Sequence, residues 1–179
     1  MDADPSLEAD LAAVLATRDR DDMTPTISAL LAIMGQHPDS PLVLFEVGGA
    51  YDGAGQPAVA VDYYEQALEL GLDGEVLCRC YLQYGSTLKN LGRIEESVAV
   101  FAKAREEFPE SLSLVAFEAL TSHAAGRHGA ALGSVLRLVA DHVDSAEISR
   151  YEISLRAYAD EIADLDDAAD PNPHGADNG

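Results

Sequence analysis

The sequence contains no tryptophan, few aromatic residues and few basic ones. Aromatic residues make up 6% of the 179 residues, which argues against a large aromatic-lined pocket. The chain has 11 Lys and Arg against 32 Asp and Glu, a formal net charge of −21. A charge of this size and sign repels nucleic acid and anionic membrane surfaces. We therefore expect neither nucleic acid nor a membrane as a partner.

Long apolar runs are absent and cysteines are rare. No segment approaches the roughly 18 consecutive apolar residues of a membrane-spanning helix. The start of the chain lacks the basic and apolar regions of a signal peptide, so we expect a cytoplasmic protein. Cys78 and Cys80 are then expected to be reduced thiols. Because residues two apart on a helix point to different faces, this pair does not indicate a shared metal site.

Helical periodicity is present almost throughout the chain. Apolar residues recur at helical spacing after four proline-containing start signals: Asp4-Pro5, Thr24-Pro25, Ser40-Pro41 and Gln56-Pro57. No strand pattern of useful length appears, so the sequence predicts an all-α fold. The segment DSAE at 144–147 has the form of a capping box and predicts a final helix over about 145–164. Residues 165–179 are acidic and rich in Pro and Gly, which predicts a disordered tail.

Five residues recur along the chain at a constant offset of 37. Gly48, Tyr51, Gly55, Tyr64 and Ala67 correspond to Gly85, Leu88, Gly92, Phe101 and Ala104. Such a repeat indicates units that bury their apolar faces against neighbouring units. It favours a binding function over a catalytic one.

These residues resemble the tetratricopeptide repeat, a helix–turn–helix unit of 34 residues, and in particular the small stand-alone bacterial members of this family. Clear repeats cover 41–74 and 78–111, and degenerate repeats cover about 5–38 and 112–143. The resemblance implies an all-α, right-handed α-solenoid of about four helix–turn–helix hairpins with a C-terminal capping helix. We expect these hairpins and the cap to form a single domain over 1–164.

The resemblance also implies where a partner binds. In this family the first helix of each pair lines a concave groove, which takes an extended peptide or a partner helix. The corresponding groove residues here are Leu42, Phe45, Asp52, Arg79, Leu82, Ser86, Lys89, Asn90 and His123.

The scarce basic residues gather in the second clear repeat, at Arg79, Lys89, Arg93, Lys103 and Arg105. One hypothesis is a site for an acidic peptide or a C-terminal carboxylate, with Asn90 as a further donor. A second is local charge balance on solvated helix faces. A third is that Arg79 or Lys89 contacts the acidic tail of the same chain.

No pattern in the sequence indicates catalysis. The five histidines lack metal-ligand spacing, and no nucleophile motif occurs. We therefore expect no enzyme activity, no metal and no cofactor. The sequence favours a protein–protein interaction module that binds a peptide or partner segment. The alternative is a homo-oligomeric scaffold, such as a homodimer, in which exposed Leu42, Phe45 and Leu82 or the terminal helix mediate self-association.

Overall fold

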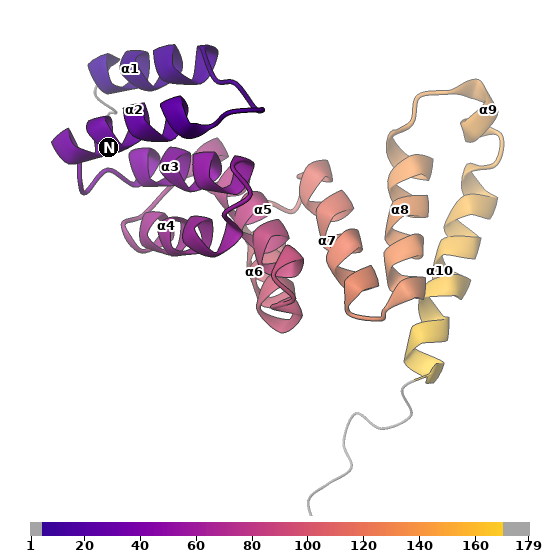
Figure 1. The fold of residues 1–179 in the computed structure, drawn as a ribbon. Helices are drawn as coiled ribbons and strands as arrows, with labels where there is room; N and C mark the ends of the chain where they lie inside the picture. Colours follow the sequence, from indigo (N-terminus) through magenta and orange to yellow (C-terminus); the bar gives the residue numbers. More distant parts are fainter. Residues whose placement is uncertain (1–4, 170–179) are drawn as a thin grey trace, which may run out of the picture. The chain divides into compact units, whose positions relative to one another are not determined.

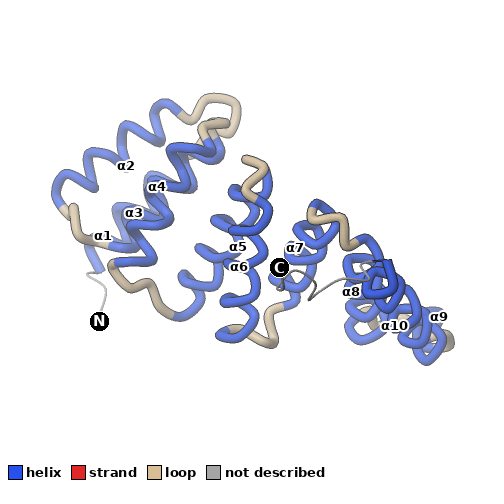
Figure 2. The backbone as a smooth tube through the Cα atoms, turned by 90° about the horizontal axis from the view of Figure 1, so that it is seen from below, coloured by secondary structure: helices blue, strands red, loops and turns tan. Residues whose placement is uncertain are grey.

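A computed structural model describes residues 5–169 of the chain as ten helices joined by short turns. Figure 2 shows helices and loops only, with no strand in this described part. The expectation of an all-α fold is confirmed. Within these residues, no helix has both the length and the apolar character needed to cross a membrane.

The chain divides into two compact units, residues 1–100 and residues 101–179, with the boundary inside α6. The helices are shown in Figure 1 and are, in chain order, α1 (Pro5–Ala16), α2 (Thr24–Gln36), α3 (Pro41–Gly53), α4 (Pro57–Glu69), α5 (Gly74–Asn90), α6 (Ile94–Glu107), α7 (Leu112–Ala124), α8 (His128–His142), α9 (Ala146–Ser149) and α10 (Glu152–Ala169). The single domain expected over 1–164 stays a prediction.

The turns between paired helices repeat with the sequence. Gly55 follows α3 with φ of 71°, and its counterpart Gly92 follows α5 with φ of 78°. Glycine adopts this left-handed conformation without steric cost. Beside each glycine, the next backbone N–H donates to an equivalent carbonyl, Gln56 to Tyr51 at 2.9 Å and Arg93 to Leu88 at 3.0 Å. The 37-residue offset is therefore a repeat of local structure as well as of sequence.

In the first unit, α3 packs against α4 through a glycine. A Cβ atom at Gly48 would lie 2.8 Å from the Tyr64 ring, so only glycine leaves room for that ring. Tyr64 is fully buried, with the rings of Phe45 and Tyr84 at 6.2 and 6.3 Å between centroids. Each helix of α1 to α5 contacts the next, and α3 also contacts α5. This stacking of helical hairpins is the arrangement expected for an α-solenoid.

In the second unit, α8 packs against α7 and α10. Its contact with α10 is made through small residues: a Cβ at Gly133 would lie 2.6 Å from the Ala159 carbonyl oxygen, and one at Gly129 would overlap the Ile162 carbonyl oxygen. The Asp166 carboxylate, near the end of α10, accepts hydrogen bonds from the N–H groups of Gly129 and Ala130. It therefore caps the free amides at the start of α8.

Two expectations about the end of the chain are wrong. The final helix predicted over 145–164 is divided into α9 and α10, and Ser145 before α9 makes no side-chain capping hydrogen bond. The tail predicted to be disordered from residue 165 is helical as far as Ala169. The physical reason is Asp166, because its bonds to the α8 amides tie this acidic stretch to a neighbouring helix. The remaining tail residues, 170–179, lie outside the described residues.

Candidate functional site

The candidate site is the face of α3 and α5 in the first unit. The two helices contact each other, and residues three or four apart on each share a face. The row on α3 runs through Leu42, Phe45, Gly49 and Asp52, and the row on α5 runs through Val76, Arg79, Gln83, Ser86 and Asn90. Of the expected groove residues, all except His123 lie on these two helices.

Arg79 of α5 lies over α3. Its guanidinium carbon is 5.1 Å from the centre of the Phe45 ring, and its Nη2 atom is 3.8 Å from Glu46 Oε1. The Phe45 side chain is only 1% exposed, so the expectation of an exposed Phe45 is wrong. Half of the Arg79 side chain remains accessible. The stacked ring and the carboxylate thus hold a guanidinium whose remaining donors are free to bind a ligand.

Glu46 is an unusual neighbour for this arginine because its carboxylate is largely buried. Burial raises the pKa of Glu46, and the charges of Arg79 and Arg18 lower it by a smaller amount. The protonated form is therefore favoured by the fold relative to the unfolded chain. Relative to the ionised form, protonated Glu46 therefore stabilises the fold. This stabilisation is fully present at pH values below the pKa of Glu46 in the unfolded chain, and it is lost as the pH rises through the higher pKa of Glu46 in the folded chain.

We expect Glu46→Gln to remove this pH dependence. As pH rises from about 4.5, the ordinary pKa of the side chain, the wild type should lose stability relative to the variant. Denaturant unfolding of both proteins at several pH values between 4 and 7 measures the difference. A constant difference across this range would show that the carboxylate titrates as in the unfolded chain.

Side chains that hydrogen-bond within the fold occupy the centre of the α3/α5 face. The Tyr64 hydroxyl donates to Gln83 Oε1 at 3.0 Å, and a Cβ at Gly49 would lie 3.3 Å from that same oxygen. Asp52 is half-buried beside Thr87: burial raises the pKa of Asp52 while the Thr87 hydroxyl lowers it. This part of the face positions the two helices and offers little free hydrogen-bonding capacity.

The C-terminal part of α5 is more open. Leu82 is half-buried, and Lys89 Nζ donates to Asn90 Oδ1 at 2.8 Å, which leaves the Asn90 amide nitrogen as a donor. Ser86 differs, because its hydroxyl is buried and has no hydrogen-bond partner within the described part of the chain. Ser86 as a residue is half-buried, and its contact with a partner segment stays a prediction.

A cleft of about 570 Å³ lies at the N-terminal end of the same face. It is formed by the start of α1, the turn between α2 and α3, and the turn between α4 and α5. Its apolar lining comes from Leu7, Pro38, Pro41, Leu42, Leu70, Leu72 and Val76, and its carboxylates from Glu8, Asp39 and Asp73. Leu42 lines the cleft and also begins the row on α3, and its part in partner binding stays a prediction.

Sequence reasoning missed this cleft. The one signal was the additional residues at 71–74, where the chain departs from the 34-residue repeat. Gly71 and Gly74 both have positive φ, so the connection follows a path that an ordinary repeat turn does not. The longer turn contributes Leu72 and Asp73 to the lining.

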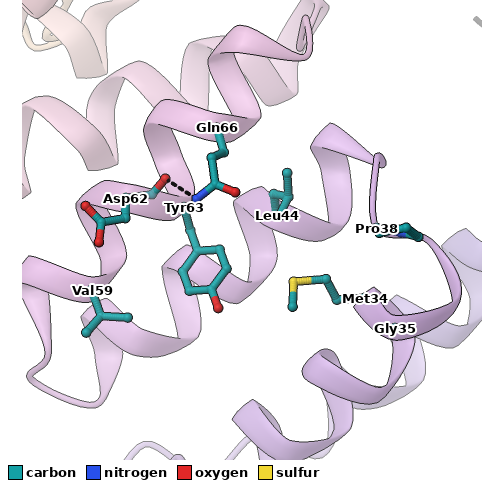
Figure 3. A pocket seen from close by; sticks show the side chains of 8 residues that line it. All are labelled: Met34, Gly35, Pro38, Leu44, Val59, Asp62, Tyr63 and Gln66. Atoms are coloured by element: carbon teal, nitrogen blue, oxygen red, sulfur yellow. Dashed lines mark hydrogen bonds between the residues drawn. The ribbon is translucent and has the colours of Figure 1, made fainter.

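A second hollow of about 490 Å³ lies between α2, α3 and α4 (Figure 3). Met34, Leu44, Val59 and Tyr63 line it, and Gln66 Nε2 donates to the Asp62 carbonyl oxygen at 3.0 Å. The hollow includes none of the expected groove residues. We therefore do not place the site there.

The other basic residues of the second repeat are engaged locally. Arg93 binds Glu96 at 2.6 Å and lies 3.7 Å from Glu65. Arg105 donates to the Pro109 carbonyl at 2.6 Å and lies 3.7 Å from Glu118. These contacts support charge balance as the role of Arg93 and Arg105. Lys103 and Arg105 lie on α6, whereas Arg79 and Lys89 lie on α5 and are therefore the basic residues that we consider for a ligand.

His123, the ninth expected groove residue, lies on α7 in the second unit. Its Nδ1 atom is 3.0 Å from Nδ1 of His128, so the two rings form an exposed pair. No group of three or more metal-ligating side chains occurs in the described residues. The role of His123 in partner binding stays a prediction.

Comparison with known proteins agrees with the geometry of the hairpins. Residues 41–162 match the family described as tetratrico peptide repeat. No curated protein matches the chain. The matched segment covers more than half of the sequence and begins at α3, the first helix of the candidate site. The chain belongs to the tetratricopeptide repeat family.

Proposed function

We propose that the chain is a protein–protein interaction module whose α3/α5 face binds one extended segment of a partner protein. Repeats of this family generally mediate protein–protein interaction, and its members are typically not enzymes. In this proposal an apolar side chain of the partner enters the cleft beside Leu42 and Val76. An acidic side chain or a C-terminal carboxylate binds Arg79.

The observation that carries this proposal is the position of Arg79. Its guanidinium is stacked on Phe45 and remains half exposed, and Val76, which lines the cleft, lies one helical turn before it. A partner segment can therefore reach the cleft and the cation at the same time. Pre-positioning by Phe45 and Glu46 also reduces the conformational entropy that Arg79 loses when a ligand binds.

The magnitudes of the two contacts explain why both are needed. An exposed ion pair contributes about 0–1 kcal/mol, which is too little for specific binding. Burial of one apolar side chain contributes about 1.5–3 kcal/mol. The proposal therefore requires an apolar residue and a carboxylate at a fixed spacing in the same peptide.

Selection from a random peptide library on the full chain tests this requirement. We expect enriched peptides to share an apolar residue and an acidic residue or free C-terminus at constant spacing. Arg79→Glu/Lys89→Glu should weaken binding of an enriched peptide at least about tenfold, a loss of about 1.4 kcal/mol. Fluorescence anisotropy with a labelled enriched peptide measures the change.

The matched control is Arg20→Glu/Arg127→Glu. Both arginines are exposed and belong to turns, Arg20 between α1 and α2 and Arg127 between α7 and α8, and the change in net charge is the same. We expect the control to bind as the wild type does. Equal binding by all three proteins would exclude Arg79 and Lys89 from the site, and equal loss in both variants would show a general charge effect.

A further inference from the structure

Large apolar side chains are exposed on two neighbouring helices of the second unit. On α10 and just before it, Tyr151, Tyr158 and Leu165 are 55%, 59% and 62% exposed. On α8 and just after it, Leu132, Val135 and Val143 are 49%, 42% and 43% exposed. The three residues of the α10 stripe are seven apart, so they lie along one side of the helix.

The two stripes lie on the same side of the α8/α10 pair. Gly129 and Gly133 of α8 face α10. On one side of this contact, Arg137 binds Asp160, and Arg156 binds Asp141. These two ion pairs occupy the polar side of both helices.

Helical geometry then places the apolar stripes. Leu132 of α8, and Val143 directly after this helix, lie on the other side of the Gly129–Gly133 row from Arg137 and Asp141. On α10, Tyr158 lies on the other side of buried Ala159 from Asp160. The α8/α10 pair therefore has one side with ion pairs and one apolar side, which we call the α8/α10 apolar face.

The apolar face is large enough for a protein interface. Its six named side chains, each about half exposed, present roughly 600 Å² of surface, which is at the upper end of the largest patch on an ordinary monomer. A stable interface buries about 800 Å² on each partner. The six side chains and the rim around them therefore supply the area of one side of a standard interface.

We infer that the α8/α10 apolar face binds a second copy of this chain. The α10 stripe is symmetric about Tyr158, with Tyr151 seven residues before it and Leu165 seven residues after it. A twofold axis beside Tyr158 therefore packs Tyr151 of each copy against Leu165 of the other and forms one closed, isologous interface. The exposed area of the face is close to what each copy contributes to a stable dimer.

Charge gives this dimer a distinctive salt dependence. Each copy carries a formal net charge of −21, so two copies repel each other. Added salt screens this repulsion and leaves the apolar contact in place. Dimerisation therefore strengthens as ionic strength rises, whereas binding of a basic partner segment to the same face weakens.

The experiment is sedimentation velocity of the full chain over a concentration series at about 0.05 and about 0.5 M NaCl. Charges are screened over a clearly shorter distance at the higher of these two salt concentrations. We expect a monomer–dimer equilibrium that shifts toward dimer at the higher salt. Tyr158→Glu should shift it to monomer, with at least about a tenfold rise in the dissociation constant. Leu132→Glu, on α8, should act in the same direction.

Ile153→Glu is the matched control. Ile153 is 85% exposed on the same helix but lies away from the Tyr158 stripe, so this variant should dimerise nearly as the wild type does. A wild type that stays monomeric at every concentration and both salts would overturn the proposal, as would a dimer that Tyr158→Glu and Leu132→Glu leave intact. Equal loss in the Ile153→Glu control would also overturn it.

A positive test uses Tyr158→Cys in a Cys78→Ser background, in which Cys80 stays buried. Oxidation should give a covalent dimer through Cys at position 158, because the two copies meet there. Cys at position 153 should give none under the same conditions. Cross-linking that is equal at both positions would contradict the twofold arrangement.

Discussion

Replacing Gly133 by alanine is expected to destabilise the second unit by about 1–3 kcal/mol, the usual result of overpacking. The new Cβ would lie 2.6 Å from the Ala159 carbonyl oxygen of α10. Because this atom belongs to a helix backbone, α10 would have to move away from α8. The Asp166 bonds to Gly129 and Ala130 depend on the same close approach. Urea unfolding followed by circular dichroism measures the loss.

The direction of the change in stability distinguishes a close helix contact at Gly133 from an open position. In a helix without close neighbours, alanine is more stable than glycine by about 1 kcal/mol. Gly35 of α2 provides that control, because a Cβ there would meet no atom within 4 Å. We expect Gly35→Ala to leave stability unchanged or to raise it. If Gly133→Ala also raised stability, α8 and α10 would not pack through Gly133.

The second large effect is expected for Tyr64→Ala in the first unit. Tyr64 is fully buried between α3 and α5, beside Gly48 and the rings of Phe45 and Tyr84. Removing a large aromatic side chain from such a site costs about 3–5 kcal/mol. Chemical denaturation should show this loss.

Tyr64→Phe distinguishes the contribution of the aromatic ring to stability from that of its hydroxyl. The hydroxyl donates to Gln83 Oε1, and Gln83 is only half-buried, so water can take its place. We expect this variant to lose about 1 kcal/mol, the usual contribution of one hydrogen bond. A loss as large as that of Tyr64→Ala would mean that the hydroxyl, and not the packed ring, holds α3, α4 and α5 together.

The features that follow from a local repeat could be predicted from the sequence. Glycine at 55 and 92 fixes two equivalent turns, and glycine at 48 leaves the space that Tyr64 fills. Ser40, predicted to start α3, accepts a hydrogen bond from the Val43 amide at 3.4 Å. These residues act on neighbours within one repeat, so the pattern of a single unit is enough to assign them.

The features that depend on contacts between more distant elements could not be predicted. Phe45 occupies a position that faces the groove in the family pattern, but Arg79 from the next hairpin covers it. The sequence pattern places Asp166 in a tail, because nothing in the local sequence indicates that it caps α8. The cleft arises from a turn that departs from the repeat, where the family pattern gives no positions to follow.

We propose that the α3/α5 face of the first unit receives a partner segment, and NMR tests this most directly. At 19.0 kDa, the protein is small enough for residue-by-residue measurement of backbone amide chemical shifts by NMR. Titration with a library-selected peptide should shift amides of α3 and α5 around Leu42, Val76, Arg79 and Lys89. Shifts confined to the α2–α4 hollow around Tyr63, or to the second unit, would contradict the account.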